Sequence, residues 1–130
     1  MSTLCTRLKN VGEAGVYQLN CSADELFEAT EQAGFVMFEA DMDKVHGKGE
    51  FLAAIAQAIH APAWFGANWD ALADALGDLS WRPSSGYVLL LRGGGDALGL
   101  NDDRNIAKAI LADTVNFWKS QGKPFWVFSC

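Results

Sequence analysis

Residues 87–92, YVLLLR, are hydrophobic at every position except the last, so the run lacks the alternation of polar and apolar side chains that marks a half-exposed strand. Two similar runs occur elsewhere in the chain, FVMFEA at residues 35–40 and PFWVFS at residues 124–129. Continuous runs of this length are typical of strands buried on both faces of a parallel sheet. A weaker run, VYQL at residues 16–19, fits an edge strand. We therefore expect a mainly parallel sheet of three strands, with residues 16–19 as the candidate for a fourth strand at its N-terminal edge.

Stretches with helical patterns separate these runs. Apolar side chains recur at helical spacing in residues 49–60, 68–79 and 102–122, and a capping box at residues 22–25 opens a further helix. In the last of the three stretches, the apolar positions at helical spacing are Ile106, Ile110, Phe117 and Trp118. Strands that alternate with helices predict a small α/β fold of three layers, in which right-handed crossovers connect the parallel strands.

The composition fits one globular domain and argues against several classes of partner. Half of the 130 residues are hydrophobic, which is enough for a single core. The formal net charge of −6 repels the phosphates of nucleic acids and the surface of anionic membranes, so we expect neither as a partner and a basic protein instead. The N-terminus lacks the apolar segment of a secretory signal, and no apolar run approaches the roughly 20 residues of a membrane span. We therefore expect a cytoplasmic protein.

The cysteines give no sign of a metal or disulfide site. Cys5, Cys21 and Cys130 are odd in number and far apart in the sequence, without a CxxC pair. This pattern argues against a disulfide framework and against a zinc site. We expect no cofactor and no bound metal.

The helix expected at residues 68–79 has an acidic face. Asp70, Asp74 and Asp78 recur every four residues, so they drift by only about 40° per step around a helix of 100° per residue and lie on one side of it. Like charges at this spacing repel, and residues 61–81 contain no lysine or arginine that would offset the repulsion. The apolar residues expected to face the core from the other side are Trp69, Leu72, Leu76 and Leu79.

The loop before this helix carries two adjacent aromatic residues, Trp64 and Phe65. Asn68 is a good N-cap, and Gly66 keeps the preceding loop out of the helix. By itself, the aspartate spacing is also typical of a solvated face that only keeps a protein soluble. An exposed aromatic residue beside a carboxylate, however, is the composition of a protein-binding hot spot. The combination favours a surface that binds a cationic protein.

Residues 62–76, PAWFGANWDALADAL, resemble the signature of the barstar family, the small intracellular inhibitors of barnase-type ribonucleases. In that family a proline and paired aromatic residues precede Gly-x-Asn, and a helix then begins x-Asp-Ala-Leu-x-Asp. The order of strands and helices from about residue 34 onward is also similar. We therefore assign residues 34–130 to a barstar-like domain, and residues 1–33 to an N-terminal extension with a short strand and a helix packed on it.

The resemblance implies a non-enzymatic inhibitor, whose loop and acidic helix plug the ribonuclease active site where cations normally hold RNA phosphates. It implies that Asp74 corresponds to the central carboxylate that mimics a phosphate, and Asp70 to a flanking one. The aromatic pair corresponds to residues that cover the catalytic centre, and the glycine and asparagine to loop contacts. The expected partner-binding residues are Trp64, Phe65, Gly66, Asn68, Asp70, Asp74 and Asp78. We expect the protein to act as a monomer.

Two positions depart from the family pattern. The best-known member has a binding glutamate late in its last helix, whereas this chain has Phe117 or Trp118 near the matching position. That member also has an aromatic residue just before the central aspartate, where this chain has Ala73. The target is therefore open: a barnase-type ribonuclease, or another toxin nuclease with a basic site for which this chain is the immunity protein.

Two alternatives from other classes remain at this point. A small hydrolase or metal-dependent enzyme would use Asp70, Asp74 and His60, although a histidine at a helix end more often complements the helix dipole. An interaction domain of the same fold without a nuclease target is the other alternative. Uptake of a divalent metal ion would favour the enzyme, and a stable partner without nuclease activity would favour the interaction domain.

Overall fold

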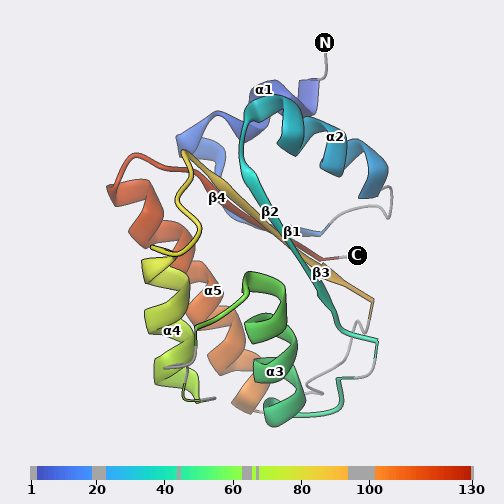
Figure 1. Ribbon diagram of the computed structural model, residues 1–130, viewed down its shortest axis with the longest axis vertical. Coiled ribbons are helices and arrows are strands. Elements are labelled where there is room, and N and C mark those ends of the chain that lie inside the picture. Colours follow the sequence, from blue (N-terminus) through green and yellow to red (C-terminus); the bar gives the residue numbers. More distant parts are fainter. Residues whose placement is uncertain are drawn as a thin grey trace.

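The computed structural model describes residues 3–18, 23–43, 45–62, 66, 68–93 and 102–129 (Figure 1). Within these ranges, a parallel sheet of four strands lies between two layers of helices. The elements follow one another as α1 (Thr3–Leu8), the 3-10 turn η1 (Val11–Glu13), β1 (Val16–Gln18), α2 (Ala23–Ala33), β2 (Val36–Asp41), α3 (Lys48–Ile59), α4 (Trp69–Asp78), β3 (Tyr87–Arg92), α5 (Asp102–Ser120) and β4 (Phe125–Ser129). The expected three-layer α/β fold is confirmed.

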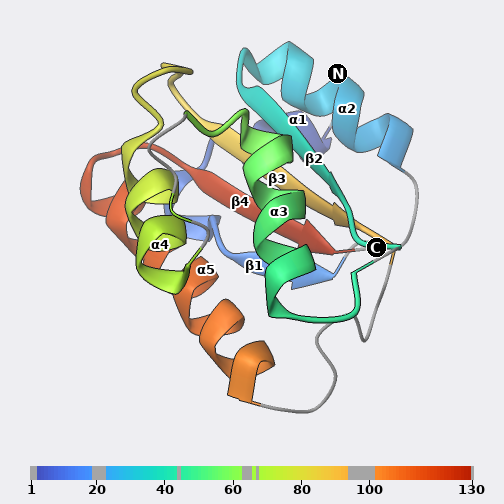
Figure 2. The same cartoon turned by 60° about the horizontal axis from the view of Figure 1, so that its bottom comes forward.

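The order of the strands across the sheet is β1-β4-β3-β2, and all neighbouring strands are parallel. From β2 to β3 to β4 the chain moves across the sheet in one direction, whereas from β1 to β2 it crosses the whole sheet in the other direction. Right-handed crossovers that run in opposite directions place their helices on opposite faces. This explains why α3, α4 and α5 cover one face of the sheet, while α2, joined by α1, covers the other (Figures 1 and 2).

The central strands β3 and β4 are buried on both faces, as their continuous apolar sequences predict. Val88, Leu89 and Leu90 of β3 are fully buried, and Leu89 lies in register between a residue of β2 and a residue of β4. Tyr87 is also buried, and burial raises the pKa of its hydroxyl group. Strand β1, the weakest run in the sequence, is a short edge strand with three exposed residues.

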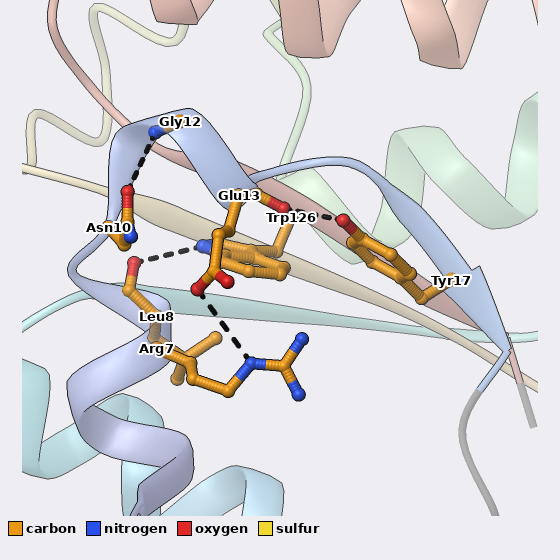
Figure 3. Close-up of polar contacts among 7 residues, drawn as sticks. All are labelled: Arg7, Leu8, Asn10, Gly12, Glu13, Tyr17 and Trp126. Atoms are coloured by element: carbon orange, nitrogen blue, oxygen red, sulfur yellow. Dashed lines mark hydrogen bonds and ion pairs between the residues drawn. The ribbon is translucent and has the colours of Figure 1, made fainter.

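The segment before β2 is attached to the sheet by specific contacts (Figure 3). The indole nitrogen of Trp126 in β4 donates a hydrogen bond to the carbonyl oxygen of Leu8 at 2.9 Å, and the Leu8 side chain is fully buried. The hydroxyl of Tyr17 donates to the carbonyl oxygen of Glu13 at 2.6 Å. Helix α1 was not anticipated, because six residues are too short for a helical period to be visible in a sequence.

The buried face of α5 differs from the apolar stripe expected from its sequence. Trp118 is buried and Ile110 is half-buried, but Ile106 and Phe117 are exposed, so the expectation was wrong for those two. The positions of α5 that face the core are Ala107, Leu111, Thr114, Val115 and Trp118. Ala107 and Thr114 contribute to this face. Because one is small and the other carries a hydroxyl group, a pattern of large apolar side chains does not predict the face. None of the described helices is long and apolar enough to cross a membrane.

Candidate partner-binding site

Helix α4 begins at Trp69, directly after an asparagine that caps it. The side-chain oxygen of Asn68 accepts a hydrogen bond from the backbone N–H of Ala71 at 2.7 Å, while its own backbone is extended. This bond satisfies one of the N–H groups that the first turn of a helix leaves without a partner. Gly66 lies close by: a Cβ atom at that position would be 3.2 Å from the Asn68 amide nitrogen. The predicted cap is confirmed, and the glycine leaves room for it.

The orientation of α4 follows from its buried leucines. Leu72 and Leu76, with Leu79 just after the helix, are fully buried, and Trp69 is half-buried. The opposite side of the helix carries the three aspartates expected on one face, Asp70, Asp74 and Asp78, all of them exposed. We call these three carboxylates the acidic row.

Within the described residues, no ion pair neutralises the acidic row. In the part of the chain that the structure describes, the ion pairs join Arg7 to Glu13 and Arg92 to Glu39. The second lies on the sheet, where the 2.7 Å hydrogen bond from Arg92 to Glu39 raises the pKa of the guanidinium group. Within the same ranges, the row accepts a hydrogen bond at Asp78, from the hydroxyl group of Ser80 at 3.3 Å. The charge of the row is therefore available to a partner.

A lysine from another helix lies near the start of the row. The ammonium group of Lys48 in α3 is 5.7 Å from the ring centroid of Trp69, which itself packs against Phe51. No local pattern in the sequence predicts this contact, because the two residues are 21 positions apart and meet only when α3 and α4 pack together. At this distance the ammonium group is within the range of a cation–π contact with the ring of Trp69.

Residues 35–130 match the family model described as Barstar (barnase inhibitor). The chain belongs to the Barstar family. The match runs from just before β2 to the end of the chain and includes α4 with its acidic row and the loop before it. The search among curated proteins finds no relative that matches the chain. At the level of the family, membership means a protein inhibitor of barnase-type ribonucleases rather than an enzyme.

The structure of this Barstar family member describes some of the expected binding residues and not others. Gly66, Asn68 and the acidic row lie together at the N-terminal half and along one side of α4. The aromatic pair Trp64 and Phe65 lies outside the described residues.

The residue set of a hydrolase is not assembled in the described part of the Barstar domain. His60 is exposed and ends α3 in a left-handed conformation with φ of 55°, and neither Asp70 nor Asp74 accepts a hydrogen bond from it. Across the described ranges, no three histidine, cysteine, aspartate or glutamate side chains are grouped so that they could hold a metal ion.

Proposed function

We propose that this protein is a cytoplasmic, monomeric inhibitor of a barnase-type ribonuclease and has no catalytic activity of its own. The acidic row and the loop from Trp64 to Asn68 are the surface that enters the basic active site of the enzyme. The observation that carries the proposal is the exposed row of three carboxylates, which form no ion pair within the described residues, on a helix inside the Barstar match.

The row suits a ribonuclease active site for a physical reason. Such a site holds the phosphates of RNA with several cations, and a carboxylate in the same place receives charge-assisted hydrogen bonds from them. Asp74 lies in the middle of the row, so it reaches the centre of a concave site while its neighbours reach the sides. The complex of barnase with barstar is itself a reference case for charged hot spots of this kind.

The loss of the central carboxylate tests this arrangement. We expect Asp74→Ala to weaken inhibition of a barnase-type ribonuclease by about a hundredfold or more, because the enzyme's cations would be buried without a partner. Asp70→Ala should weaken it less, since that carboxylate lies at the end of the row. Inhibition constants at low and moderate salt measure both effects, and the association rate should fall as salt screens the long-range attraction.

A matched control separates the site from the overall charge. Glu31→Ala removes one exposed carboxylate from α2, on the opposite face of the sheet, and should leave inhibition unchanged. If Asp74→Ala inhibits as well as the wild type while its circular dichroism spectrum is unaltered, the site assignment is wrong. If the wild-type protein inhibits no barnase-type ribonuclease, the proposed function is wrong.

A second candidate is an immunity protein for another toxin nuclease with a basic active site. The departures from the family pattern favour it, because Ala73 stands where the best-known member has an aromatic residue, and Phe117 or Trp118 is near the position of its glutamate. Inhibition of a panel of basic nucleases distinguishes the two candidates. The acidic row would act in the same way in both.

A further inference from the structure

Phe117 is a large apolar side chain on the surface of α5, with 44% of its area exposed. It is not loosely placed, because its ring packs edge-on against Trp118 with the ring centroids 5.2 Å apart. Trp118 in turn is buried and donates a hydrogen bond from its indole nitrogen to the carbonyl oxygen of Leu76 in α4 at 2.9 Å. The exposed ring is therefore held against a fixed neighbour.

The ring of Phe117 also lies directly beside α4. A Cβ atom at Gly77 would be 4.0 Å from a ring carbon of Phe117, which is van der Waals contact. Gly77 lies three residues after Asp74, and positions three apart on a helix are surface neighbours. Ala73, four residues before Gly77, is exposed and carries only a methyl group. The two residues of α4 on this side of Asp74, Ala73 and Gly77, are therefore both small.

We propose that Phe117 and Asp74 together bind one arginine side chain of the ribonuclease, with the guanidinium group on the phenyl ring and its N–H groups directed to the carboxylate. This inference rests on the proposed function and specifies the partner's chemistry at that site. A guanidinium group is planar, weakly hydrated and able to stack on a ring while its edge pairs with a carboxylate. A lysine ammonium is a strongly hydrated point charge that lacks this planar geometry, so the arrangement favours arginine over lysine.

Charge decides between the occupants of this surface. A second copy of the chain would bring a net charge of −6 and the same acidic row to the patch, and a nucleic acid would bring phosphates. Both are repelled by the carboxylates next to the ring. A basic protein is attracted, and of its side chains arginine uses both the ring and the carboxylate.

Another exposed aromatic residue offers a matched comparison. Phe27 in α2 is 37% exposed, but it lies on the layer of helices that covers the other face of the sheet. Phe27→Leu replaces an exposed phenyl ring by leucine, as Phe117→Leu does, but at a position away from the acidic row.

The test is the dissociation constant of the complex with a barnase-type ribonuclease, measured calorimetrically for each variant. We expect Phe117→Leu to weaken binding by roughly 3- to 30-fold, the range of a cation–π contact. Phe117→Tyr restores the ring and most of the affinity, and Phe27→Leu has no effect. In a protein that already carries Asp74→Ala, Phe117→Leu should weaken binding by less than about twofold, because residues that hold one group are energetically coupled.

The outcomes separate this inference from the proposed function. A wild-type protein that binds no ribonuclease overturns both. Binding that depends on Asp74 but is unchanged by Phe117→Leu overturns only the role of Phe117. An equal loss with and without Asp74→Ala would make Phe117 an independent apolar contact and overturn the assignment of an arginine. Phe117→Met is measured in parallel, so that the conclusion does not depend on the stability of one variant.

Discussion

At the scale of single residues, Asn68 combines a structural role with an expected binding role. Its side chain caps α4 through the 2.7 Å bond from the N–H of Ala71. We expect Asn68→Ala to lower the free energy of unfolding by about 1 kcal/mol, the usual effect of losing an N-cap, as measured by urea denaturation. Asn68→Ser keeps a capping oxygen and should stay close to the wild-type stability.

These two variants also separate capping from contact with the ribonuclease. If Asn68 only positions the acidic row, Asn68→Ser binds like the wild type and Asn68→Ala somewhat more weakly. If both variants bind equally weakly, the amide itself contacts the enzyme. An unchanged free energy of unfolding in Asn68→Ala would contradict the capping role.

The sequence predicts those features of the site that depend on residues close together in the chain, and not those that depend on packing between distant segments. The acidic row and the cap at Asn68 depend only on neighbours within α4, so their spacing was enough to predict them. The exposure of Phe117 and the position of Lys48 over Trp69 depend on how helices pack against one another, and no local pattern encodes that.

At the scale of elements, tryptophans connect the ends of helices to other parts of the fold. The last carbonyl groups of a helix have no partner within it. Among the described residues, three indole N–H groups each donate to such a carbonyl in the last turn of a helix. The pairs are Trp126 with Leu8 of α1, Trp81 with Ile59 of α3, and Trp118 with Leu76 of α4. These three tryptophans therefore have a structural role, and only the structure reveals their partners.

Helix α5 fixes α4 through one of these bonds. We expect Trp118→Phe to lower the free energy of unfolding by about 1–3 kcal/mol, because the carbonyl group of Leu76 is left buried without its donor. Urea denaturation with circular dichroism detection measures the change. Ribonuclease affinity should fall as well, since Trp118 also supports the ring of Phe117. A variant as stable as the wild type would show that the bond does not hold the two helices together.

At the scale of the whole molecule, the apolar runs were sufficient for the parallel sheet but not for the order of its strands. Pairing of β1 with β4 joins segments that are more than 100 residues apart, which the sequence patterns do not encode. This pairing brings the N-terminal segment onto the sheet, where Leu8 and Leu26 are fully buried. We propose that residues 3–33 belong to the same folding unit as the region that matches the Barstar family.

Leu8 provides the test of that proposal. Its side chain is fully buried in the core, although α1 lies outside the Barstar match. We expect Leu8→Ala to lower the free energy of unfolding by about 2–5 kcal/mol. The variant should still unfold in a single transition. Lys9→Ala, at an exposed neighbouring position, is the control and should have little effect. Tryptophan fluorescence and circular dichroism during urea denaturation measure both variants, since coincident curves indicate that the segment and the sheet unfold together. Separate transitions, or an unchanged midpoint for Leu8→Ala, would instead make the segment an independent attachment.

Where the Leu8→Ala protein is folded, its ribonuclease affinity should equal that of the wild type, because the acidic row lies on the opposite face of the sheet.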